Sequence, residues 1–179
     1  YGTQCPVLTF ASDDQQIGKS TFAAWFGHSW DGNPYYTCHT DTPVDPTNKD
    51  SRLNSTRVMV QELGELGTLS RRDTNDVKNY LTLQEIFERP PYGHIPRAFK
   101  PMAVFIATAN LEDGMFNDIE NRRFLVLYLK SISLEYRKID RKQLLAQALA
   151  LCESNPEKLE LTPTEKTAQK QENHQYEKE

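Results

Sequence analysis

Short apolar runs bounded by polar or turn-forming residues recur along this chain, and runs of this kind predict buried strands. The pattern is followed by residues 5–10, 56–62, 103–109 and 124–129. The last two runs are apolar at nearly every position, which is typical of strands covered by helices on both faces of a sheet.

Amphipathic stretches lie between and after these runs. Apolar residues spaced three or four positions apart predict helices over residues 18–28, 71–82 and 140–152. Thr162 and Glu165 form a helix start signal before a tail that carries few apolar residues. The alternation of strands and helices predicts an α/β fold with a mainly parallel sheet flanked by helices and a C-terminal helical tail.

Two segments do not follow either period. Residues 31–55 contain Pro34, Pro43 and Pro46 and are expected to be mostly irregular, with a strand at 35–39 as the alternative. Between residues 85 and 99, Gly93 lies between two arms that suit strands, but the prolines on both sides of it exclude a regular central hairpin. This segment predicts an edge hairpin.

The length of 179 residues suits one domain. We expect this domain to span residues 1–152 and to be followed by an acidic, truncated helical tail over residues 153–179. The net charge of −4 excludes a globally basic nucleic-acid-binding surface, so any contact with DNA must be local. The three cysteines show no C-x-x-C spacing, and no apolar run is long enough to span a bilayer. These features predict a soluble protein of the cytoplasm.

Gly18-Lys19-Ser20 follows a predicted strand and opens a predicted helix, which is the context of the second half of a phosphate-binding loop. Backbone amides at a helix N-terminus favour an anion, and the Lys19 ammonium would neutralise a β/γ-phosphate pair. The Ser20 hydroxyl would ligate Mg²⁺. Because G-K-S also occurs by chance, an ordinary strand, loop and helix is the alternative.

Asp13 stands where such a loop has its first glycine, and Asp14 follows it. Two carboxylates near a triphosphate repel it unless both side chains point away. Aspartate also cannot match glycine for close approach of the backbone to a phosphate.

Further polar residues stand near the predicted strands in an order that suits a P-loop NTPase. Glu62 and Glu65 could hold Mg²⁺ or orient water, Asn110 could sense the γ-phosphate, and Arg122 or Arg123 could stabilise transition-state charge, including across a subunit boundary. Each has a plainer alternative: a solvated strand end, a turn and a surface ion pair. The ordered set is less expected by accident than any member.

With this set the sequence resembles the virulence-associated protein E family of phage and mobile-element proteins, whose ATPase domain is similar to superfamily 3 helicases. The resemblance covers most of the chain. Its motifs are Q-Q-I-G-K-S-T-F at 15–22, V-Q-E-L-G-E-L at 60–66, V-K at 77–78, R-P-P-Y-G at 89–93, Arg97, A-T-A-N at 107–110 and N-R-R-F at 121–124. The family's loop usually has glycines where this chain has Asp13 and Gln16.

The resemblance implies a P-loop NTPase fold of the AAA+ or superfamily 3 type that binds ATP and Mg²⁺. The implied nucleotide contacts are Gln15, Gln16, Ile17, Gly18, Lys19, Ser20 and Thr21, with Mg²⁺ at Ser20 and Glu62. Asn110 would be the sensor, and Arg122 or Arg123 would act on a neighbour's nucleotide, which implies a homo-oligomeric ring. In similar helicases a hairpin grips single-stranded DNA in the pore, which maps onto His94, Arg97 and Lys100.

Three functions follow as hypotheses. The first is an ATP-driven DNA helicase in the replication of a phage or mobile element, with Glu62 orienting the attacking water. The second is a degenerate P-loop module that binds nucleotide weakly and acts in DNA binding or assembly. This hypothesis is based on Asp13 and Gln16, which stand where the family's loop usually has glycines. The third, a phosphotransferase, lacks a visible acceptor-binding cluster.

Overall fold

The computed structural model describes residues 6–27, 39–41, 45–64, 71–110, 123–156 and 160–174. Five strands form one parallel sheet in the order β2-β3-β6-β1-β7. They are β1 (Val7–Ser12), β2 (His39–Thr40), β3 (Val60–Leu63), β6 (Val104–Asn110) and β7 (Phe124–Tyr128). The four apolar runs of the sequence therefore supply four of these strands, and the parallel sheet is confirmed.

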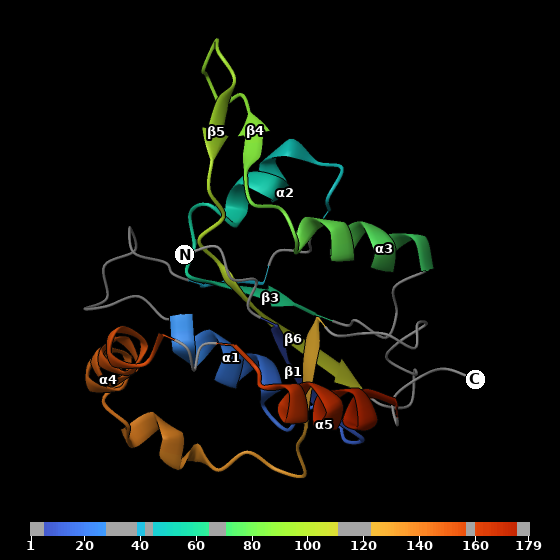
Figure 1. Cartoon of the computed structure of the whole chain (residues 1–179), viewed down its shortest axis with the longest axis vertical. Coiled ribbons are helices and arrows are strands. Elements are labelled where there is room, and N and C mark those ends of the chain that lie inside the picture. The colour runs from blue at the N-terminus through green and yellow to red at the C-terminus, as the bar shows by residue number, and fades with distance from the viewer. Residues whose placement is uncertain are drawn as a thin grey trace.

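Helices cover both faces of this sheet (Figure 1). On the side called here the α1 face, helix α1 (Lys19–Gly27) packs Ala23 against Phe10, Val60 and Ile106. On the opposite side, the α3 face, helix α3 (Arg71–Tyr80) contributes Val77 to the larger core cluster. That cluster also contains Val7, Ala11, Leu63, Ala107, Ala109, Phe124 and Val126. Alternation along each strand separates the two clusters, because successive side chains point to opposite faces.

The remaining helices are α2 (Lys49–Asn54), the 3₁₀ helix η5 (Leu134–Lys138), α4 (Arg141–Ser154) and α5 (Pro163–His174). The side chain of Asp140 caps α4. At α5 the Thr162 amide donates to Glu165 Oε2 at 2.8 Å, and the Glu165 amide donates to Thr162 Oγ1 at 3.3 Å. This reciprocal pair confirms the start signal of the tail. None of the helices in the described ranges has the length and apolarity that crossing a membrane requires.

Helix α5 packs against β7, which is an edge strand of the sheet. Gln169 Nε2 and Asn173 Nδ2 both donate to the Phe124 carbonyl, at 2.6 and 2.9 Å, and both side chains are buried. Polar rather than apolar residues therefore attach the tail, which explains why its sequence offers no apolar stripe. The predicted boundary at residue 152 lies in the last turn of α4, and the division into core and tail stays a prediction.

Several predicted boundaries differ from the structure, and two of the differences concern strands that end at the site. Strand β1 continues through Ser12 instead of ending at residue 10, and β3 begins at Val60 instead of 56. Before β3 the chain still turns out of α2, with the Thr56 amide donating to the Leu53 carbonyl at 3.1 Å. Helix α2 itself lies in the segment expected to be irregular; it is capped by Asn48 and is too short to show a helical period.

The segment expected to form an edge hairpin is a separate antiparallel pair, β4 (Ile86–Glu88) and β5 (Arg97–Phe99), and does not join the main sheet. Ile86 packs with Leu53 and Tyr80. Glu88 forms an ion pair with Arg52 of α2. These contacts fix the base of the hairpin, while its tip projects beyond α2 (Figure 1).

Candidate functional site

The loop at residues 13–18 joins the carboxyl end of β1 to α1, next to the carboxyl end of β6. The chain leaves β1 toward the β2 edge of the sheet and leaves β6 toward the β7 edge. The two connections therefore cross rather than diverge, and the position of the loop rests on the strand ends: ligands of open α/β sheets lie outside the carboxyl ends of the strands. The topology therefore places this loop at the position where a ligand is expected.

Lys19 reaches from the first turn of α1 across the ends of both strands. Its Nζ donates to Ser12 Oγ, to Asn110 Oδ1 at 2.8 Å and to the Asp14 carbonyl at 3.5 Å. Ser12 and Asn110 are partners in the β1–β6 register, so their side chains lie side by side on the α1 face. The predicted phosphate-binding lysine and the predicted sensor amide are in direct contact.

Lys19 is buried, with 9% of its surface exposed. Burial lowers the pKa of its ammonium, and the nearby charge of Asp14 partly opposes that shift. A cation that has lost hydration to neutral partners gains more from an incoming anion than a fully solvated one does. The electrostatics at this position therefore favour a phosphate group.

The loop adopts left-handed backbone conformations at two positions, with φ of 64° at Gln16 and 94° at Gly18. A Cβ built on Gly18 would meet nothing within 4 Å, so the backbone angle and not the space favours glycine there. Alternation of right- and left-handed residues turns successive N–H groups to one side and forms an anion-binding concavity. The Gly18 carbonyl already accepts the first α1 hydrogen bond, from the Phe22 amide at 2.9 Å.

Asp13, which replaces the first glycine, does not point at Lys19. Its Oδ2 accepts a hydrogen bond of 2.6 Å from the hydroxyl of Tyr128, at the end of β7. Tyr128 is in register with Ala11 and so belongs to the α3 face. The carboxylate is thus directed to the opposite side of the sheet from Ser12 and Asn110.

Glu62 is buried on the α1 face, where its Oε1 accepts a hydrogen bond of 3.4 Å from Thr108 Oγ1. The register pairs Glu62 with Ile106, so its Cα lies four residues, roughly 13 Å of strand, before the level of Asn110. The side chain of Thr108 occupies the level between them. Glu62 therefore faces the same side as Lys19 but lies deeper along the sheet.

The other predicted residues of the loop and helix start are near Lys19 by chain connectivity. Gln15, Gln16, Ser20 and Thr21 are exposed, and Ile17 is half-buried. Glu65 and Arg122 lie outside the described residues. Within the described ranges, no group of three or more His, Cys, Asp or Glu side chains is placed to hold a metal ion.

Arg123 lies just before β7, and its carbonyl accepts the Val7 amide at 2.6 Å. Val7 begins β1, so Arg123 is at the amino edge of the sheet and the loop is at the carboxyl edge. The strand between them measures roughly 16 Å. The structure does not bring Arg123 together with the Lys19 of the same chain.

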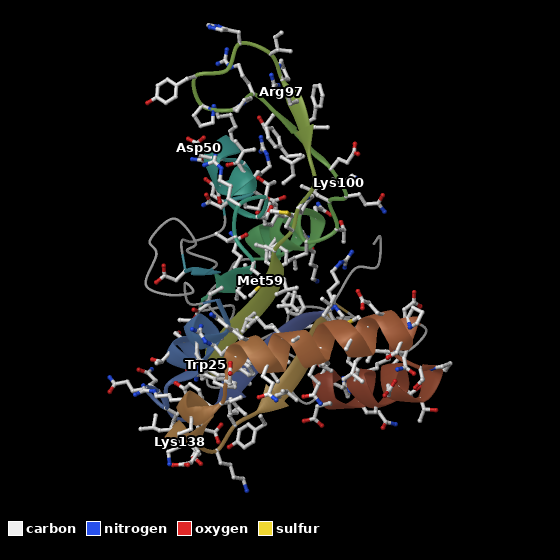
Figure 2. The ribbon with its side chains drawn as sticks, turned by 90° about the vertical axis from the view of Figure 1, so that its left-hand side faces the viewer. Trp25, Asp50, Met59, Arg97, Lys100 and Lys138 are labelled. Atoms are coloured by element: carbon white, nitrogen blue, oxygen red, sulfur yellow. The ribbon has the colours of Figure 1, made fainter. Side chains whose placement is uncertain are left out.

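His94, Arg97 and Lys100 are exposed on the hairpin and its flank. Figure 2 shows Arg97 near one end of the molecule and Lys100 nearer its middle, both away from Trp25 of α1 and from Lys138. These three predicted nucleic-acid contacts thus form a second location, separate from the loop.

Three residues that contact the predicted site residues were not predicted from the sequence: Ser12, Thr108 and Tyr128. Ser12 lies beyond the predicted strand at residues 5–10, but because it follows Phe10 by two residues, a longer strand places both side chains on one face. Thr108 is the polar residue two positions before Asn110, a spacing that puts both on one face. Nothing local signals Tyr128, because its role depends on β7 pairing with β1.

Gln16 offers a test of the loop conformation. The left-handed backbone costs a non-glycine residue about 1 kcal/mol, whereas any new glycine also stabilises the unfolded chain by about 0.4 to 1 kcal/mol. Gln15, its neighbour, is not left-handed. We expect Gln16→Gly to have an unfolding free energy about 1 kcal/mol higher than that of Gln15→Gly in urea denaturation. Equal values for the two variants would contradict the loop conformation described here.

Comparison with known proteins identifies a family for this chain and finds likenesses among solved structures. No curated protein matches this chain significantly. Among solved structures, the A-form apo structure of the NrS-1 C-terminal region is similar, with a TM-score of 0.49 and 16% identity; the match covers 83% of this chain but 36% of that chain. The family model of the virulence-associated protein E-like domain matches residues 2–178. The chain therefore belongs to the virulence-associated protein E-like domain family.

Proposed function

We propose that this chain is a P-loop ATPase domain that binds ATP and Mg²⁺ and acts as a DNA helicase motor in the replication of a phage or mobile element. The observation that carries the proposal is the position of Lys19. Its ammonium joins Ser12 and Asn110 at the carboxyl ends of two adjacent strands, beside a loop with two left-handed residues. A lysine, a concave loop and a helix N-terminus together suit a polyphosphate.

The chemistry that we assign is in-line attack of water on the γ-phosphate. Lys19 neutralises charge on the phosphates, Ser20 at the start of α1 ligates Mg²⁺, and Asn110 positions the γ-phosphate or the attacking water. Glu62 lies deeper than Lys19, and Glu65 follows Glu62 by three residues in the sequence. We assign the water-orienting and Mg²⁺-binding carboxylates to this pair.

The position of Arg123 supports an oligomer. Because Arg123 lies at the opposite edge of the sheet from Lys19, it cannot reach the phosphate bound in its own chain. From this edge Arg123 can act on nucleotide only in an adjacent copy, and we propose its sequence neighbour Arg122 as the alternative residue for this role. A ring of identical subunits provides that arrangement at every site.

The hairpin is the proposed contact to DNA. Residues 89–100 include Arg89, Arg97 and Lys100 and no acidic residue, in a chain whose net charge is −4. Tyr92 at the tip is fully exposed. Cations beside an exposed aromatic ring suit single-stranded DNA, because the cations bind phosphates and the ring stacks on a base.

A thermal melt with ATP·Mg²⁺ tests nucleotide binding. A ligand that binds only the native state at one hundred times its Kd stabilises it by about 2.7 kcal/mol, which for a chain of this length raises the melting temperature by about 5 to 10 °C. We expect that shift with ATP·Mg²⁺ and a much smaller one with ATP plus EDTA. The absence of a shift at millimolar ATP·Mg²⁺ would favour the alternative, a degenerate module that acts in DNA binding or assembly.

A further inference from the structure

Asp13 stands where a phosphate-binding loop has its first glycine, so its carboxylate would repel a bound phosphate if the two lay close together. A unit charge repels another of the same sign by about 1 kcal/mol at 4 Å even in water. Asp13 is exposed and begins the loop that leads to Lys19. A freely rotating carboxylate at this place would compete with any phosphate for the Lys19 ammonium.

The structure assigns to Tyr128 the role of a positioning residue for this loop: its hydroxyl holds the Asp13 carboxylate on the α3 face, away from the anion position beside Lys19. The hydrogen bond between Tyr128 and Asp13 Oδ2 is 2.6 Å long. The inference rests on the proposed nucleotide site, which it deepens by naming what allows an acidic residue in the loop.

The sheet register gives this contact its geometry. Tyr128 is the last residue of β7 and pairs with Ala11 of β1, so its ring lies on the α3 face beside the start of the loop. Ser12, the next residue of β1, faces the other way and accepts from Lys19. Alternation therefore separates Asp13 from the ammonium, and the Tyr128 hydroxyl keeps the carboxylate there.

The electrostatics of Tyr128 agree with this assignment. The hydrogen bond to Asp13 raises the pKa of the phenol above its ordinary value of 10.0, and the charges of Asp13 and Asp14 add to the shift. The Asp13 side chain is thus the acceptor for the Tyr128 hydroxyl, and this contact makes loss of the phenol proton less favourable.

A double-mutant cycle on ATP·Mg²⁺ binding tests the proposal, with the dissociation constant measured by isothermal titration calorimetry at low and high salt. Tyr128→Phe removes only the hydroxyl and should weaken binding about fivefold at low salt, because it frees one charge near the phosphates. The loss should shrink at 1 M salt, where exposed charges are screened over about 3 Å. In an Asp13→Asn background, Tyr128→Phe should leave the dissociation constant of ATP·Mg²⁺ unchanged.

The controls separate this idea from the proposed function. Tyr136→Phe on η5 removes a hydroxyl that accepts a hydrogen bond from the neighbouring Arg137 side chain, and it should leave nucleotide binding unchanged. If the unmodified chain binds ATP·Mg²⁺ but Tyr128→Phe binds equally well, or loses as much in the Asp13→Asn background, the positioning role is wrong while the nucleotide site stands.

A second measurement does not need nucleotide. NMR titration of ring-labelled tyrosine should show that Asp13→Asn moves the Tyr128 pKa down toward its ordinary value. Melting curves of each variant confirm that it is folded. If the unmodified chain binds no ATP, the proposed function fails and this titration decides the contact alone: an unchanged Tyr128 pKa would overturn the inference.

Discussion

Lys19→Ala is expected to abolish the ATP-induced rise in melting temperature and to lower ATP turnover by about 10² to 10³-fold, the usual effect of removing one preorganised donor from a reacting group. The physical reason is that the substitution removes the buried ammonium that joins Ser12 and Asn110 at the strand ends. A steady-state phosphate-release assay and melts with and without ATP·Mg²⁺ measure both effects.

Two further variants make this result interpretable. Lys19→Met keeps most of the aliphatic stem and removes the charge, so it should lose turnover equally while disturbing the packing less. Lys138→Ala removes an exposed lysine that pairs with Glu135 on η5, and it should behave like the unmodified chain. Normal turnover in both Lys19 variants would show that the phosphate site lies elsewhere.

The double substitution Arg97→Ala/Lys100→Ala is expected to weaken binding of single-stranded DNA by about tenfold at physiological salt. Loss of two phosphate contacts should also reduce the slope of log K against log salt by about 1.4, because each contact on a single strand contributes about 0.7. Fluorescence anisotropy with a labelled oligonucleotide, repeated over a range of salt concentrations, gives both quantities.

The matched control is Arg137→Ala/Lys138→Ala, which removes the same two residue types from η5, away from the hairpin (Figure 2). Because the net charge changes equally, a general electrostatic effect would weaken both variants alike. Only a local contact at the hairpin weakens the first and spares the second. ATP binding should be unaffected in both, since Lys19 lies on a different part of the molecule.

Much of the fold could be predicted from the sequence, because strands and helix starts leave local signals. Strands were predicted from runs of apolar residues around residues 7, 104 and 124. Helix starts were predicted from capping residues such as Asp140 and Thr162. These signals are local, because they depend on a residue and its near neighbours. The same locality explains the failure at α2, which spans less than two turns and buries few side chains.

The strand boundaries were harder because they depend on partners distant in sequence. Ser12 belongs to β1 since Asn110 lies beside it, and polar residues at a strand end cannot be told from loop residues without that partner. Likewise, the hairpin at 86–99 is attached by contacts with Arg52, Leu53 and Tyr80. These residues lie outside the hairpin, so its own sequence does not indicate them. Pairing and packing therefore corrected the local pattern.

By itself the sequence determined the α/β alternation, the G-K-S motif at a helix start and the family to which the chain belongs. Only the tertiary structure decided that Lys19 donates to Asn110 and that Tyr128 donates to Asp13 on the α3 face. It also decided that Arg123 lies at the opposite edge of the sheet from the loop. The reason is that strand order and register are non-local: they bring together side chains up to 115 residues apart, and no local period records that pairing.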